Sequence, residues 1–211
     1  MLSLLPVPLS ELLAATVEHI DLCLVSLALA CGVAFPLGVW LARKPKLSDP
    51  MLTALGALYT IPSLAMLAIL VPLLGLGRGS AIVALVLYAQ FILLHSVILG
   101  MQSVDRASIE AAQGLGLSPL RIFTLVEAPM AMPVWISGLR HATLSTLSIA
   151  TTAAWIHAGG LGTLIFEGLS QNNTGKILAG AVLISALALC FDTLLKAVEN
   201  EAAVIAAGQA S

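Results

Sequence analysis

The sequence has few charged residues, and this scarcity decides the class of protein. Of its 211 residues, 9 % are Asp, Glu, Lys or Arg and 59 % are hydrophobic, whereas soluble domains carry roughly a quarter charged residues. A soluble globular domain is therefore excluded, and we expect a membrane protein in contact with lipid. The net charge of −2 comes without a large basic cluster, so we expect no nucleic-acid partner.

Cysteines and clusters of catalytic residue types are also scarce. Cys23, Cys31 and Cys190 all lie within apolar runs, which favours small core-packing thiols over a disulfide or a metal site. No paired nucleophile and base and no acid pair is evident, so an intramembrane enzyme is the weakest interpretation. Residues 1–10 contain no basic residue and two prolines, which is unlike a signal peptide.

What the sequence does contain is long apolar segments. A spanning helix needs about 20 mostly apolar residues, and five segments meet this test, at about 18–42, 51–74, 79–102, 130–156 and 175–197. Asp49 and Pro50 are expected to be the cap and first residue of the second segment. The predicted fold is an all-α polytopic membrane protein, with a single domain over residues 1–211.

The stretch at about 103–129 separates the third and fourth segments. Asp105 is a plausible N-cap of a helix that ends near Gln113, and Ser118 with Pro119 is typical of a second helix start. We expect Pro129 to stop this second helix. Because nine or ten residues rise only about 15 Å, neither helix spans a bilayer, and both should lie along the membrane surface facing a partner.

Within this stretch, Glu110-Ala111-Ala112, Gly116 and the closing Pro129 resemble the EAA loop of ABC-importer membrane subunits. The resemblance implies a coupling helix that seats in a groove of a cytoplasmic ATP-binding subunit and passes on nucleotide-driven motion. The chain has no Walker A sequence, so the resemblance also implies that ATP and Mg are bound by that separate subunit. No cofactor, metal or enzymatic activity is then expected in this chain.

Three further motifs resemble a narrower group. Tyr-Thr-Ile-Pro-Ser-Leu-Ala at 59–65, Ala-Gly-Gly-Leu-Gly at 158–162 and Asn-Thr-Gly-Lys-Ile-Leu-Ala-Gly-Ala at 173–181 are similar to the membrane subunits of importers for glycine betaine, carnitine and choline. This resemblance implies a separate extracytoplasmic substrate-binding protein and a second permease subunit, either a copy or a close paralogue. A methionine-type permease and a standalone channel are the alternatives.

The fourth apolar segment carries a polar stripe. Its members recur at helical spacing: Ser137, His141, Ser145, Ser148 and Thr152. Small hydroxyl residues can pack helices together, or they can form the wall of a translocation path, and we expect both near a dimer axis. A proline break beside hydroxyls can line a polar cavity, which adds Tyr59, Pro62 and Ser63 to the predicted path.

Arg140 and His141 are the costly residues within the apolar segments. An arginine at a helix centre costs roughly 2.5–3.5 kcal/mol on insertion scales, so it should find a carboxylate, a carbonyl or water. We expect Arg140 to extend towards the interface rather than to contact substrate. His95 is expected to be a core histidine whose hydrogen bonds are satisfied.

The segment at about 158–170 is apolar but too short to span. Its pattern indicates a re-entrant or interfacial helix on the outer side, with Gly159, Gly160 and Gly162 as an outer gate.

The basic residues between segments one and two and between three and four outnumber those in the loops on the other side of the membrane. Under the positive-inside rule, this predicts a multi-pass protein of the bacterial plasma membrane, with its N-terminus outside and its C-terminus cytoplasmic.

Overall fold

A chain in lipid must satisfy its backbone hydrogen bonds within each segment, and for apolar runs the helix does this. The computed structural model describes residues 7–208, and within them every regular element is helical. The elements are α1 (Leu9–Ala42), α2 (Pro45–Tyr59), α3 (Ser63–Leu74), α4 (Arg78–Gln102), α5 (Arg106–Gly114), α6 (Pro119–Ile122), the π-helical turn η2 (Phe123–Glu127), α7 (Ala128–Ala153), the 3-10 turn η3 (Ala154–Ile156), α8 (Leu161–Ser170) and α9 (Thr174–Ala206).

Within residues 7–208, four helices are long and apolar enough to cross a membrane: α1, α4, the stretch from α6 to η3, and α9. They match the first, third, fourth and fifth predicted segments, although α1 begins earlier and α9 ends later than predicted. The second predicted segment is not one straight helix, because α2 and α3 meet at an angle of 95°. It counts as a fifth span only if this bent pair is taken together.

The bend lies at the predicted proline break. Pro62 has an extended backbone, with φ −56° and ψ 137°, and a proline disfavours the helical conformation of the residue before it. The carbonyl oxygen of Ile61, left without a helical partner, accepts a hydrogen bond from the Tyr88 hydroxyl of α4. The expected start of α2 was wrong: Pro45, not Pro50, occupies the first turn, where proline's missing N–H costs nothing.

The core lies where α1, α3, α4 and α7 meet. Leu22, Leu67, Leu85 and Leu147 come from these four helices and are each almost fully buried in one cluster. The helices approach closely because small residues face each other at the crossings. A Cβ atom at Gly138 of α7 would overlap the side chain of Ser96 on α4.

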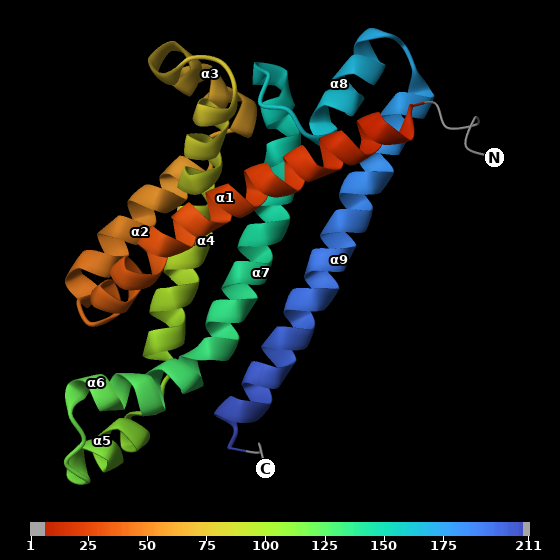
Figure 1. Ribbon diagram of the computed structural model, residues 1–211. Helices are drawn as coiled ribbons and strands as arrows, with labels where there is room; N and C mark the ends of the chain where they lie inside the picture. The colour runs from red at the N-terminus through yellow and green to blue at the C-terminus, as the bar shows by residue number, and fades with distance from the viewer. Residues whose placement is uncertain (1–6, 209–211) are drawn as a thin grey trace.

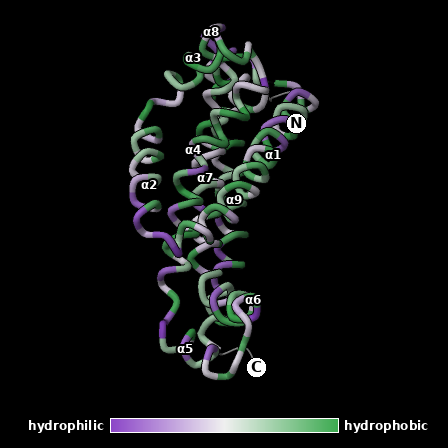
Figure 2. Tube along the Cα trace, turned by 90° about the vertical axis from the view of Figure 1, so that its left-hand side faces the viewer, coloured by the Kyte–Doolittle hydropathy of each residue, from purple (hydrophilic) through white to green (hydrophobic). Residues whose placement is uncertain are grey.

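Figure 1 shows how the elements are distributed along the bundle. The short helices α5 and α6 project at one end, while α3 and α8 lie at the opposite end. Figure 2 shows mostly hydrophobic residues along the long helices and hydrophilic ones near α5 and at the start of α2. This distribution agrees with a membrane-embedded bundle that carries a surface segment at one end.

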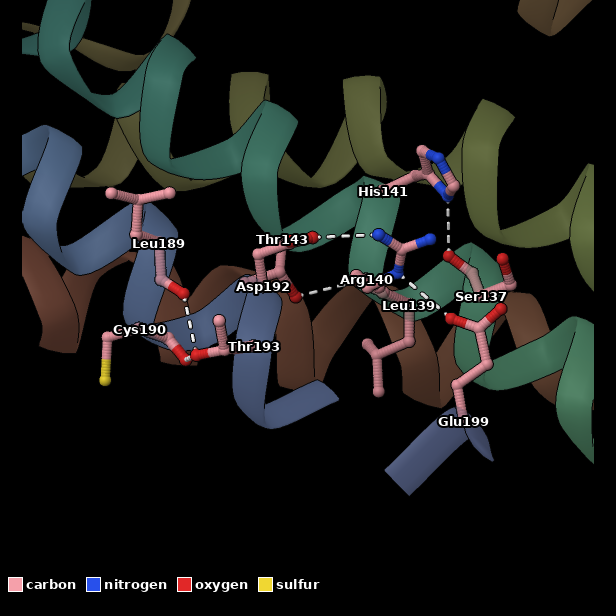
Figure 3. A network of polar contacts seen from close by, with 10 residues as sticks. All are labelled: Ser137, Leu139, Arg140, His141, Thr143, Leu189, Cys190, Asp192, Thr193 and Glu199. Atoms are coloured by element: carbon pink, nitrogen blue, oxygen red, sulfur yellow. Dashed lines mark hydrogen bonds and ion pairs between the residues drawn. The ribbon is translucent and has the colours of Figure 1, made fainter. Parts of the chain in front are cut away.

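Arg140 of α7 is held inside the bundle by two carboxylates of α9. Its Nη1 lies 2.9 Å from Asp192 Oδ1 and its Nε lies 3.0 Å from Glu199 Oε2, as Figure 3 shows. The arginine side chain is only 20 % exposed. The expected carboxylate partner is therefore present, and Arg140 is satisfied within the chain without having to extend to the interface.

We predict that Arg140→Ala lowers the free energy of unfolding by roughly 1–3 kcal/mol, because Asp192 and Glu199 would then face each other without a cation. Thermal unfolding in detergent micelles measures this change. Lys196→Ala is the matched control, since Lys196 is an exposed base of α9, the helix that carries Asp192 and Glu199, and forms no ion pair with any described residue. Equal stability of the two variants would contradict the prediction.

Candidate functional site

The surface segment of residues 103–129 begins as the sequence predicts. The Asp105 carboxylate caps α5 by accepting a hydrogen bond from the Ser108 N–H at 3.3 Å, and α5 ends at Gly114. Gly116 then adopts φ +75°, a left-handed conformation that glycine tolerates best. Pro119 opens α6, so the loop between the two helices is short and defined.

The expectation that Pro129 stops the second helix is wrong. The helix continues from α6 through the π turn η2 into α7, and Pro129 lies in the first turn of α7. The π turn includes one extra residue, and the N–H of Ala128 bonds to the Phe123 carbonyl. This wider turn is where a proline can be accommodated in a continuous helix. From Pro119 onward the surface segment and α7 thus form one continuous helical element.

The predicted coupling residues differ in exposure. Glu110, Ala111 and Gly116 are exposed, whereas Ala112 is buried and packs inward. Large apolar side chains on the same segment face outward, with Leu115 at 81 % and Leu120 at 72 % exposure. Exposed apolar side chains rimmed by polar ones are typical of a docking surface.

A cleft of about 350 Å³ lies between this segment and the end of α1. Its lining residues are Arg43, Ile109, Gln113, Leu117, Pro119, Ile122 and Glu127. Arg43 forms an ion pair with Glu127 at 2.6 Å, which ties the end of α1 to the π turn. Sequence reasoning assigned these two residues no role together, because they are far apart in the chain.

A second feature lies beside the α2–α3 bend, where α4 and α7 form a shared wall. Two adjoining depressions of about 380 and 510 Å³ share Tyr59 and Ser145, and we call them together the groove. The Tyr59 hydroxyl lies 3.4 Å from Ser145 Oγ. The groove is lined by Tyr59, Thr60, Ile61, Pro62, Ser63, Tyr88, Phe91, Ile92, His95, Ser96, His141, Ser145, Ser148 and Ile149.

Most of the predicted path residues meet in this groove: Tyr59, Pro62, Ser63, His141, Ser145 and Ser148. Thr152 lies at its edge, with its hydroxyl 3.4 Å from Ser63 Oγ. Ser137 is not part of the lining, and its carbonyl accepts a hydrogen bond from His141 Nδ1 at 2.8 Å. The face of α7 that the sequence stripe marks therefore borders the groove, except at Ser137.

The expectation that His95 is a core histidine is wrong. His95 is exposed and lines the groove. Phe91, one turn earlier on α4, lines it as well and was not predicted. Residues four apart on a helix share a face, so the pair could have been noticed together. An apolar segment without a strong polar face gives no indication of which side is inward.

The predicted outer gate contacts the first half of α1. The Gly160 N–H donates to Glu18 Oε2 at 3.0 Å, and Gly159 and Gly160 both have φ +82°. A Cβ atom at Gly160 would lie 2.9 Å from His19 Nδ1, so only glycine fits. His19 itself is fully buried and its Nε2 lies 3.2 Å from the Leu147 carbonyl. Neither Glu18 nor His19 was predicted to contact this segment.

The chain resembles characterised proteins over most of its length. It is 39 % identical over 191 residues to the choline transport system permease protein OpuBB of Bacillus subtilis, covering 90 % of this chain and 88 % of that protein. It is 37 % identical, over the same shares, to the glycine betaine/carnitine/choline transport system permease protein OpuCB of the same organism. A carnitine transport permease protein, OpuCB of Listeria monocytogenes, is 36 % identical over 90 % of this chain and 87 % of its own length.

Solved structures share the fold. The inward-facing MetNI methionine ABC transporter superposes with a TM-score of 0.82 at 19 % identity, covering 92 % of this chain and 97 % of that one. At that identity the match shows the fold alone. The family model for the inner membrane component of binding-protein-dependent transport systems matches residues 34–203. The chain therefore belongs to the family of binding-protein-dependent transport system inner membrane components.

Proposed function

We propose that this chain is the permease subunit of an ATP-driven importer for a quaternary-amine osmoprotectant, namely glycine betaine, carnitine or choline. The observation that carries the proposal is its similarity over about nine-tenths of the chain to permeases named for these substrates. The groove supports the proposal, because it offers aromatic rings and hydroxyls beside the α2–α3 bend.

The surface segment is the proposed coupling element. Glu110, Ala111, Gly116 and the outward-facing leucines would dock on a separate cytoplasmic subunit that binds ATP and Mg. The buried Ala112 would pack α5 against the rest of the chain. Pro129, in the first turn of α7, would lie where the docked segment joins the spanning helix. Because α6, η2 and α7 are continuous, displacement of α6, which carries the exposed Leu120, would move α7 directly.

The groove is the proposed translocation path, and a second permease subunit would complete it. An extracytoplasmic substrate-binding protein would deliver substrate at the opposite end, where Gly159, Gly160 and Gly162 form the proposed outer gate. Arg43, Lys44 and Lys46 lie at the junction of α1 and α2, and the positive-inside rule favours the cytoplasmic side for such a junction. The N-terminus would then lie outside and the C-terminus inside.

A methionine importer is the competing function within the family, because the superposed transporter carries that name.

We predict that the complex of this chain with its ATP-binding subunit and binding protein, in lipid nanodiscs, hydrolyses ATP faster when glycine betaine, carnitine or choline is added. Stimulation by methionine alone would reject the quaternary-amine assignment. Purification of this chain without any ATP-binding partner would favour a standalone channel.

We predict that Glu110→Lys leaves folding intact and abolishes ATP-dependent uptake in proteoliposomes. A reversed charge on an exposed docking face costs several kcal/mol when it meets a like charge, enough to lower uptake by about 100-fold. Glu201→Lys is the matched control, since Glu201 is also exposed but lies on α9. Size-exclusion chromatography checks folding and co-purification checks docking. Normal uptake by the Glu110 variant would remove this residue from the coupling role.

A further inference from the structure

The groove holds a row of aromatic rings drawn from two helices. The Tyr59 ring, at the end of α2, lies 5.2 Å from the Phe91 ring and 5.8 Å from the Tyr88 ring of α4, measured between centroids. The Phe91 ring is in turn 6.2 Å from the His95 ring. Tyr59, Phe91 and His95 share one depression of the groove, so a molecule within it lies beside several aromatic side chains.

These rings are fixed in position by their neighbours. Gly56 of α2 lies against the Phe91 ring, and a Cβ atom there would approach the ring to 3.3 Å. The Tyr88 hydroxyl bonds to the Ile61 carbonyl at the bend, and the Tyr59 hydroxyl lies 3.4 Å from Ser145 Oγ. A ring row held on both sides needs little rearrangement to receive a ligand, which lowers the entropic cost of binding.

The groove has no carboxylate to bind a cation. Among its lining residues, all within the described part of the chain, there is no Asp, Glu, Lys or Arg. A quaternary ammonium group has no N–H to donate, so hydroxyls cannot hold it by hydrogen bonds from nitrogen. The faces of aromatic rings carry partial negative charge and attract such a cation by about 0.5–2 kcal/mol. Weak attraction suits a path, because a transported solute must also leave.

We propose that Tyr59 and Phe91 form a cation–π station that recognises the quaternary ammonium group of the substrate during its transit through the permease. The proposal rests on the proposed function and adds a recognition step within the membrane subunit. The Phe91 face supplies attraction alone, whereas Tyr59 also contributes its hydroxyl beside Ser145. The substrate-binding protein selects first, and the station then favours methylated cations over neutral molecules of the same shape.

Graded fluorination of Phe91 tests the station. Each fluorine withdraws electron density from the ring face with little change of shape, so mono-, di- and trifluorophenylalanine at position 91 should lower uptake stepwise. The complete complex is reconstituted in proteoliposomes with saturating wild-type binding protein and ATP, and the initial rate of glycine betaine uptake is measured. Loss of the full interaction corresponds to a fall of about 2- to 30-fold.

A second readout does not depend on turnover. Saturation-transfer NMR on the permease–ATPase complex in nanodiscs, without binding protein, detects weak contact with the N-methyl protons of glycine betaine. We expect a signal with the wild-type chain and a weaker one with trifluorophenylalanine at position 91. Tyr59→Phe should keep the N-methyl signal because the ring remains, and Tyr59→Leu should lose it.

Phe35 provides the matched control. Its ring packs edge-on against Trp135 at 5.6 Å, outside the groove, so trifluorophenylalanine at position 35 should leave uptake unchanged. Equal effects of fluorination at positions 35 and 91, in a complex that imports glycine betaine normally, would overturn the station alone. A wild-type complex that imports another solute but no quaternary amine would overturn both the station and the proposed function.

Discussion

The close contact between α4 and α7 is the constraint on which the other features depend. Gly138 of α7 lies against Ser96 of α4, and Gly100 of α4 lies so close to Trp135 that a Cβ atom would be 2.7 Å from its ring. No larger residue fits at either crossing, so the two helices form one rigid unit. That unit provides the shared wall of the groove, carries the polar stripe of α7 and continues into the surface segment. Packing that brings these helices together therefore also positions both candidate sites.

The outer helix α9 is held differently, because very little of it is buried. Only Gly180 and Ala202 are fully buried among its described residues, and apolar side chains such as Leu183, Ile184 and Leu187 are only partly buried against the core. Ion pairs add to this packing towards both ends of the helix. Near its start Lys176 pairs with Glu167 of α8 and with Glu11 of α1 at 3.0 Å, and further along Arg140 pairs with its two carboxylates. In a low-dielectric surrounding such pairs are costly to separate once formed.

The sequence predicted those features that depend on local chemistry. Run length located four spans, and the cap at Asp105 and the polar face of α7 followed from residue type and helical spacing. Other features were missed or misjudged, because they depend on a distant contact or have no local signature. Pro62 indicated a break, but the 95° bend also involves Tyr88 bonding to Ile61. Pro129 looks the same at the end of a helix as in its first turn, and the π turn before it has no sequence signature.

The positions of His19 and His95 could not be predicted from the sequence either. His19 is fully buried and His95 is exposed in the groove, the reverse of what the segment composition suggested for His95. A helix that is apolar on all sides has no polar face, so its sequence pattern does not indicate which side is buried. Only the arrangement of α1, α4 and α7 settles which side of each helix is enclosed.

This arrangement limits how the proposed transport movement can proceed. The seam between α4 and α7 is too tight to slide, so a displacement of the docked surface segment would tilt the two helices together. The irregular points lie around that unit: the π turn at Phe123–Glu127, and the bend at Tyr59–Pro62 that borders the groove. Backbone that departs from regular helix is where rotation requires the least loss of packing. Movement would therefore change the groove on its α2–α3 side, where the aromatic ring of Tyr59 faces those of α4.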